Sequence, residues 1–235
     1  MRKLIVMAVF VAAPVFAASP FLRAGVGSDR GGDTTVRDRD CTATAPPALF
    51  GCGIDARGDF GRSAAWNLGA GYEWNATRVE LAITHRPGFE LDAQASFLGV
   101  SEDQPVDARV KSTAAMLQTS RQFGWFFVEG GVGVARNTID TTRYSFPSIA
   151  PEAVTITEGG THNAFAWSAG AGVTVPVRPR LSLDIVVSYA RLGHIETDAG
   201  TATIIRPNRT LMLEIAGTEA KLETAGVRAS LRWRL

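Results

Sequence analysis

The final stretch of the chain reads Thr224-Ala225-Gly226-Val227-Arg228-Ala229-Ser230-Leu231-Arg232-Trp233-Arg234-Leu235. Apolar side chains occupy every second position, and glycine, serine or arginine stand between them. A period of two is the spacing of side chains on one face of a β-strand. This stretch therefore predicts a strand with one apolar face and one face that is small or charged.

The same alternation recurs in seven further segments, which are residues 21–28, 63–75, 77–86, 109–121, 125–137, 161–175 and 181–191. The pattern is weakest in 109–121, where Val110, Ala114 and Met116 form the apolar set and Leu117 falls outside it. Repeated short alternating segments without a helical period predict an all-β fold. We expect eight strands.

The connections between these segments alternate strictly in length. Three are short, around Asn75-Ala76, 122–124 and 176–180, whereas residues 29–62, 87–108, 138–160 and 192–223 form long connections. In an antiparallel up-and-down arrangement, alternate connections lie at opposite ends. The pattern predicts a transmembrane β-barrel with short periplasmic turns, periplasmic termini and four long extracellular loops.

Alternation alone does not say which face points outward, because a soluble barrel that binds an apolar ligand carries its apolar face inside. Two features favour the membrane arrangement. The polar face is mostly glycine, alanine and serine with sparse charges, which suits a narrow interior better than a soluble surface. Aromatic residues near strand ends predict a girdle at the membrane interfaces, formed by Trp66, Trp74, Trp125, Trp167 and Tyr189.

Several segments resemble the opacity-protein and OmpA-like families of eight-stranded outer-membrane barrels. The similarity rests on residues 78–81, 127–135, 165–173 and 227–235, and it extends over the whole mature chain. In those families the final strand ends in an aromatic residue that the barrel-assembly machinery recognises. The resemblance implies that Leu231, Trp233 and Leu235 form this assembly signal, although Leu235 departs from the aromatic ending and Trp233 keeps the alternation.

The N-terminus has the three parts of a secretory signal peptide. Met1-Arg2-Lys3 is basic, residues 4–16 are apolar, and Val15-Phe16-Ala17 forms a cleavage site. We expect removal of residues 1–17 and one barrel domain over 18–235. Secretion also predicts a disulfide between Cys41 and Cys52, which would contribute roughly 3 kcal/mol.

Charged residues on the polar face must pair if they lie inside a narrow barrel. We expect a lumen network of Arg78, Glu80, Glu129, Asp184 and Arg228. Such a network is either a structural plug or the gate of a narrow channel, and the sequence favours the plug because eight strands leave an interior just wide enough for side chains.

Other motifs carry little chemistry. His85, His162 and His194 fall near the ends of the long connections, without the spacing of a catalytic triad, and we expect no catalytic or metal site and no cofactor. Arg57-Gly58-Asp59 lies in the first long connection and resembles an integrin-recognition tripeptide. The charge is balanced, with 24 Lys+Arg against 23 Asp+Glu, so nucleic acid is not an expected partner.

These features predict an integral outer-membrane protein with a structural or surface-interaction role, adhesin-like or antigen-like, through its extracellular loops. The expected partners are outer-membrane lipids, lipopolysaccharide and the barrel-assembly machinery. A narrow porin-like channel is the first alternative, a lipid-modifying outer-membrane enzyme the second, and a soluble secreted barrel the third.

Overall fold

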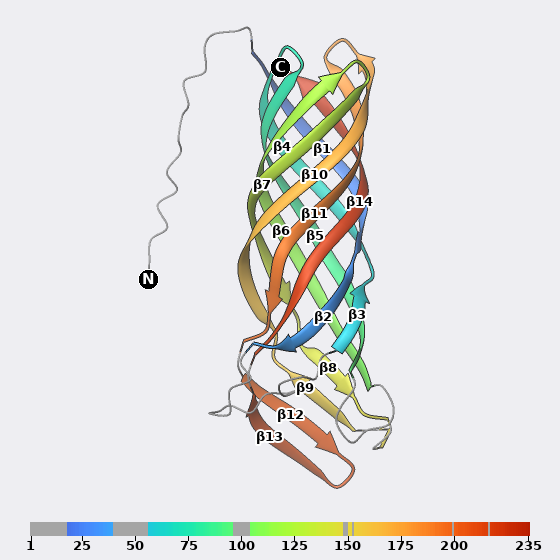
Figure 1. The fold of residues 1–235 in the computed structure, drawn as a ribbon, viewed down its shortest axis with the longest axis vertical. Coiled ribbons are helices and arrows are strands. Elements are labelled where there is room, and N and C mark those ends of the chain that lie inside the picture. Colours follow the sequence, from blue (N-terminus) through green and yellow to red (C-terminus); the bar gives the residue numbers. More distant parts are fainter. Residues whose placement is uncertain are drawn as a thin grey trace, which may run out of the picture.

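A computed structural model describes residues 18–39, 56–95, 104–147, 150–151, 153–198, 200–215 and 217–235. Eight long antiparallel strands close into a barrel, because the first of them pairs with the last (Figure 1). In ring order they are β1 (Ser19–Gly31), β4 (Arg62–Trp74), β5 (Thr77–Ala95), β6 (Gln104–Phe123), β7 (Phe126–Ile139), β10 (Gly160–Arg178), β11 (Leu181–Glu196) and β14 (Thr218–Arg234). The eight-stranded barrel predicted from the alternation is confirmed.

The barrel is strongly sheared. Following paired residues once around the ring from Arg30 leads back to β1 at Pro20, ten residues earlier. In an eight-stranded barrel such a stagger requires strands tilted by roughly 40° and leaves an interior that side chains fill.

Tight turns join the strands at the end of the barrel that also holds the C-terminus and the start of β1 (Figure 1). The turns lie at Asn75-Ala76, Gly124-Trp125 and Pro179-Arg180. Asn75 and Gly124 have φ of 53° and 64°, a backbone conformation that asparagine and glycine adopt most readily. We call this the turn end.

The long connections at the other end contain further strands that the alternation did not predict. Their described parts contain six short strands: β2 (Asp33–Asp38), β3 (Ala56–Phe60), β8 (Thr142–Ser145), β9 (Val154–Thr157), β12 (Gly200–Arg206) and β13 (Arg209–Ile215). β2 and β3 lie between β14 and β5, whereas β8, β9, β12 and β13 extend the sheet from β6. The barrel wall therefore continues well beyond the tight ring.

The polarity of the wall inverts along each long strand, as β14 illustrates. Toward the C-terminus, Val227 and Trp233 are exposed on the outer face while Arg228 is buried inside. Toward its start, Lys221 is exposed and Leu222 is buried inside. The turn-end part, with its apolar exterior, is called the belt, and the part beyond it, with a polar exterior and an apolar interior, is called the rim.

β5 repeats this inversion. In the belt, Leu81 is exposed over the buried Glu80, whereas in the rim Glu90 is exposed and Phe89 is buried. A break in the pairing register between Arg86 and Phe89 marks the change. The barrel is thus built like a membrane protein at one end and like a soluble barrel at the other.

The weak segment around residues 109–121 was assigned to the wrong face. Val110, Ala114 and Met116 point into the barrel and are buried, whereas Leu117 is exposed on the outside. At Val110 the interpretation failed because this end of β6 runs into the rim, where the interior is apolar. Met116, by contrast, is an apolar side chain inside the belt, paired in register with Ala82. Within the described ranges, the chain forms no helix long and apolar enough to cross a bilayer.

Candidate functional site

Eight charged side chains fill the interior of the belt, and we call them the lumen ion cluster. They are Arg23, Glu73, Arg78, Glu80, Glu129, Asp184, Arg228 and Arg232, contributed by six strands. Every second residue of a belt strand points inward, so the alternation itself delivers these groups to the lumen. All but Glu73 have side chains less than a tenth exposed.

One half of the cluster is centred on Arg23. Its guanidinium forms an ion pair with Glu80, lies 3.4 Å from the Glu129 carboxylate, and donates a 2.8 Å hydrogen bond to Gln118. Arg228 contacts the other oxygen of Glu129, also at 3.4 Å. Two arginines therefore share one carboxylate across the barrel.

The other half is centred on Asp184, whose side chain is 1% exposed. Its Oδ2 lies 3.0 Å from both Arg78 Nη1 and Arg232 Nε, and its Oδ1 accepts a 2.7 Å hydrogen bond from Thr174. Arg232 also pairs with Glu73. Three partners surround this buried carboxylate, which is the condition under which an internal charge is tolerated.

The five residues expected in the lumen network all lie in this cluster. Sequence reasoning named too few arginines, because Arg23 and Arg232 are also central to it. It missed the buried pair of Asp29 and Arg86 as well. Both residues stand at the ends of the alternating segments, where the polarity pattern inverts, and strand parity was the only signal that could have placed them inside.

The cluster leaves little open space. A cavity of about 10 Å³ remains among Arg23, Arg78, Glu80, Gln118 and Glu129, which is roughly the room needed for one water. The ring of Phe127 lies 4.5 Å from the Arg78 guanidinium carbon and is fully buried.

A second, apolar plug fills the rim. Its largest fully buried side chains include Phe60, Phe89, Leu192, Leu222 and Tyr144. Phe60 and Phe89 meet edge to face, with ring centroids 6.5 Å apart. Polar and apolar plugs therefore close the described interior in series.

The residues expected in the aromatic girdle lie on the outer wall. Trp74 and Trp125 stand at the turn end, and Trp66, Trp167 and Tyr189 lie toward the rim. Tyr189 contacts Trp167 with ring centroids 5.5 Å apart, and the Trp66 ring lies 5.1 Å from that of His85. The residues of the expected assembly signal, Leu231, Trp233 and Leu235, are exposed on the belt.

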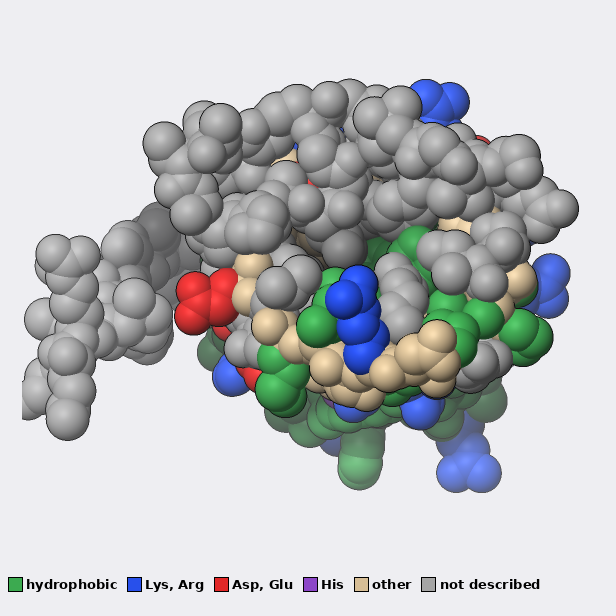
Figure 2. Space-filling model, turned by 90° about the horizontal axis from the view of Figure 1, so that it is seen from below, with side chains coloured by type: hydrophobic (Ala, Val, Ile, Leu, Met, Phe, Trp, Pro, Cys, Tyr) green, Lys and Arg blue, Asp and Glu red, His purple; other side chains and the backbone are tan. Residues whose placement is uncertain are grey.

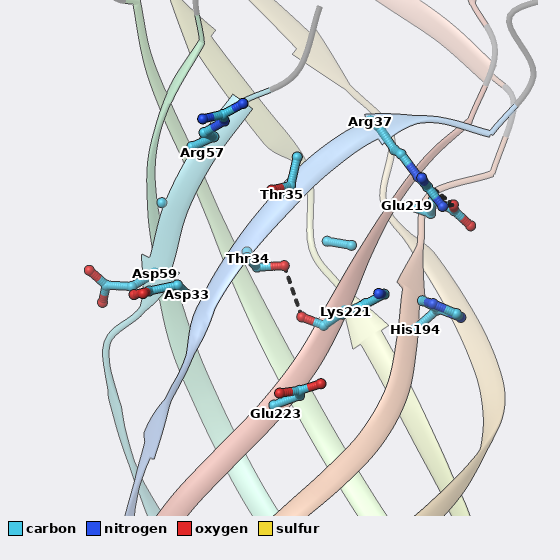
Figure 3. A pocket seen from close by; sticks show the side chains of 12 residues that line it. Asp33, Thr34, Thr35, Arg37, Arg57, Asp59, His194, Glu219, Lys221 and Glu223 are labelled. Carbon is cyan, nitrogen blue, oxygen red and sulfur yellow. Dashed lines mark hydrogen bonds and ion pairs between the residues drawn. The ribbon is translucent and has the colours of Figure 1, made fainter. Parts of the chain in front are cut away.

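The rim carries a polar groove of about 810 Å³ on its outer wall. Asp33 and Asp59, directly paired on β2 and β3, lie at one side, and Lys221 and His194 from β14 and β11 lie at the other (Figure 3). Arg37 and Glu219 pair at 2.7 Å beside it. Figure 2 looks onto the rim and shows hydrophobic side chains between polar and basic ones in the part that is described.

The tripeptide Arg57-Gly58-Asp59 was expected in an exposed loop, and this was wrong. It forms the middle of β3, which pairs with β2 on one side and β5 on the other. An added Cβ at Gly58 would lie 2.1 Å from the Asp92 carbonyl oxygen, so the glycine is required by close strand packing. The tripeptide is thus a rigid, extended element of the groove wall.

The histidines of the described residues differ in their partners. No set of three His, Asp, Glu or Cys side chains among them could hold a metal ion. His162 lies 3.2 Å from Glu196, and the His194 imidazole has no hydrogen bond or ion pair with another described residue. Cys41, Cys52 and the expected signal peptide lie outside the described residues.

The chain matches the family model of the outer membrane protein beta-barrel domain over residues 4–230. It is similar to the structure of outer membrane protein OprG from Pseudomonas aeruginosa, with 14% identity, a TM-score of 0.58, and alignment of 92% of this chain and 96% of that chain. Outer membrane protease OmpT from Escherichia coli aligns at 9% identity with a TM-score of 0.52, over 92% of this chain and 97% of that chain. These identities show the fold alone. No curated protein matches the sequence.

Proposed function

Because the chain belongs to the outer membrane protein β-barrel family, we propose that it is a non-conducting surface protein that presents its rim for adhesin-like or antigen-like interaction. The observation that carries this proposal is the double closure of the interior, by the lumen ion cluster in the belt and the apolar plug in the rim. A permeation path would have to break buried ion pairs and then cross a packed apolar core, both of which are costly.

We infer that the turn end and both mature termini face the periplasm and that the rim projects from the cell. Short turns at the periplasmic side and long connections outside are typical of such barrels. Residues 88–95 of β5 belong to the rim, and at a tilt near 40° they rise about 20 Å above the belt. A rigid wall of this height holds an interaction surface clear of the lipid.

The groove is the described surface best suited to a partner. Acidic Asp33 and Asp59 oppose basic Lys221 and His194 across it (Figure 3), so it offers complementary charges to a polar macromolecule. We propose no catalytic role, since His162, which has Glu196 as a carboxylate partner at 3.2 Å, forms no hydrogen bond with a serine or threonine side chain of the described residues. We further propose that the barrel-assembly machinery inserts the chain through its last strand, where Trp233 lies on the outer face.

Planar-bilayer recording separates this function from the channel alternative. The wild-type barrel and Glu129→Ala should both show no stepwise conductance, because Glu129 removal leaves the apolar plug of the rim intact. Reproducible single-channel steps from the wild type would overturn the proposal. Conductance from the variant alone would show that the ion cluster is the only barrier, which also contradicts the double closure.

Labelling of intact cells tests the orientation. In a chain carrying Cys41→Ala and Cys52→Ala, Met212→Cys on β13 and Ala76→Cys in a turn provide one thiol at each end. Met212 is 72% exposed. A membrane-impermeant maleimide should label the first variant on whole cells and the second only after lysis, and the reverse pattern would refute the orientation.

Attachment assays test the interaction role. Cells that express the chain should adhere to host-cell monolayers better than non-expressing cells, and Asp59→Ala with Lys221→Ala should abolish most of the gain. Arg178→Gln at the turn end is the matched control and should change nothing. Equal adhesion of expressing and non-expressing cells would exclude an adhesin-like role.

A further inference from the structure

Basic residues encircle the outer wall where the belt meets the rim. On five of the eight barrel strands, the first charged side chain met on the outer face beyond the apolar belt is arginine or lysine; these are Arg30, Arg62, Lys111, Arg136 and Arg191. Figure 2, seen from the rim side, shows Lys and Arg side chains at several places around the outline of the molecule. These cationic side chains therefore lie at a similar level along the barrel axis, at the edge of the apolar outer surface.

Two of these arginines stand directly opposite one another. Arg30 on β1 pairs in register with Arg62 on β4, and both side chains are exposed on the outer wall. Neither forms an ion pair or a side-chain hydrogen bond with another described residue. Like charges in directly paired positions destabilise a sheet. Stability of the sheet therefore does not explain why two arginines stand at these positions.

The surroundings of the pair suit a lipid headgroup. On its other side Arg30 is paired with Ala225, whose small side chain leaves the guanidinium open. Trp66 lies on the same face of β4 as Arg62, four residues deeper in the belt, which is about 10 Å along the barrel axis. At a membrane surface, aromatic rings are expected at the edge of the hydrocarbon core, and cationic side chains are expected about one headgroup layer further out. Trp66 and the two arginines follow this order.

We propose that Arg30 and Arg62 together bind a phosphate of the glycolipid of the outer leaflet, the lipid A part of lipopolysaccharide. Two guanidinium groups can each donate two hydrogen bonds to one phosphate, which a single exposed cation cannot. The phosphate would also cancel the repulsion between the arginines. The choice of lipid A rests on the orientation proposed above, which places the belt–rim boundary in the outer leaflet.

The test uses the folded mature barrel in detergent micelles and native mass spectrometry, with three probes: bis-phosphorylated lipid A, lipid A without phosphates, and phosphatidylglycerol. The variants are Arg30→Gln/Arg62→Gln and, as a control of equal charge loss at the other end, Arg178→Gln/Arg180→Gln. Heat-modifiable gel mobility verifies that each variant is folded. A further variant, Arg30→Lys/Arg62→Lys, keeps both positive charges but removes the forked hydrogen-bond donors of the guanidinium groups.

We expect the glutamine pair at the boundary to weaken lipid A binding at least tenfold, the lysine pair to weaken it by less, and the control to stay within twofold of wild type. The wild-type barrel should bind phosphate-free lipid A no more tightly than the glutamine variant binds bis-phosphorylated lipid A. Unchanged binding by that variant, or equal binding of phosphate-free lipid A, would overturn the site. Phosphatidylglycerol binding as tight as that of lipid A would show a general anionic-lipid site and refute the assignment. Micelles impose no orientation, so the two experiments fail separately. A reversed labelling pattern on cells would refute the proposed orientation and, with it, lipid A as the natural ligand, whereas unchanged binding by the glutamine variant in micelles would refute the arginine site alone.

Discussion

Asp184 is the residue whose removal most directly tests the lumen ion cluster. Its carboxylate is 1% exposed and contacts Arg78 and Arg232, whose side chains are 5% and 3% exposed. In Asp184→Ala, Arg78 keeps a 3.2 Å hydrogen bond to Gln122 and its contact with the Phe127 ring, but no carboxylate partner. Arg232 keeps its pair with Glu73. Breaking a buried ion pair from one side costs about 3–5 kcal/mol, because a charge stays buried without its partner.

A matched control comes from the exposed wall. Lys111 and Asp140 approach to 3.0 Å, the same distance as in the buried pair, but their side chains are 44% and 40% exposed. Solvent screens such pairs, so Asp140→Ala should cost less than about 1 kcal/mol. The two aspartates thus differ in burial and not in contact distance.

The free energy of unfolding can be measured by urea titration of the barrel in lipid vesicles, followed by tryptophan fluorescence and heat-modifiable mobility. Replacing the buried charges together, as Asp184→Leu with Arg78→Met and Arg232→Met, should restore most of the loss, because apolar side chains of similar volume often substitute for a buried ion group at little cost. Equal destabilisation by Asp184→Ala and Asp140→Ala would refute the reasoning.

Three further predictions concern other parts of the barrel. Phe89→Ala in the rim plug should lower the free energy of unfolding by about 3–5 kcal/mol and make the rim sensitive to protease. Glu90→Ala, at the exposed neighbouring position, should do neither, and equal protease sensitivity of the two variants would contradict a packed plug. Gly133→Ala should destabilise by about 1–3 kcal/mol, because its Cβ would lie 2.0 Å from a carbonyl oxygen of β6, whereas Gly130→Ala, with 3.6 Å to its nearest neighbour, should be tolerated in the same urea titration. Burial raises the pKa of the Tyr144 hydroxyl in the rim, so the folded state keeps this proton to higher pH than the unfolded state, and the corresponding stability is complete below about pH 10 and lost above it. Tyr144→Phe should reduce that alkaline loss, and an unchanged pH profile would contradict the assignment.

The fold could be predicted because alternation reports faces directly. Residues 224–235 alternate without a break and residues 181–191 do so except at Val186, and the corresponding strands β14 and β11 lie next to each other in the ring. The predicted strands were nevertheless too short: the segment 77–86 is the start of β5, which runs to Ala95. The prediction took the apolar face of each strand as the outer face. In the rim the apolar side chains point inward, so this criterion no longer finds the strand there.

The site could be predicted only in part for the same reason. Glu129 and Asp184 lie in segments where most apolar residues fall at every second position, so their inward direction follows from parity. Asp29 and Arg86 lie at the inversion, where polarity no longer distinguishes inside from outside and strand parity is the only local signal left. The partners within the cluster come from strands up to 159 residues apart, as in the pair of Glu73 and Arg232.

By itself the sequence determined the number of strands in the barrel ring, the end at which the turns lie and, outside residues 109–121, which belt residues face the lumen, because all three follow from local periodicity and connection length. Only the tertiary structure decided that the long connections continue the barrel wall, that Arg57-Gly58-Asp59 is a paired strand, and that Arg30 faces Arg62. Those facts depend on pairing between distant segments and on the shear of the closed ring, which no local pattern contains.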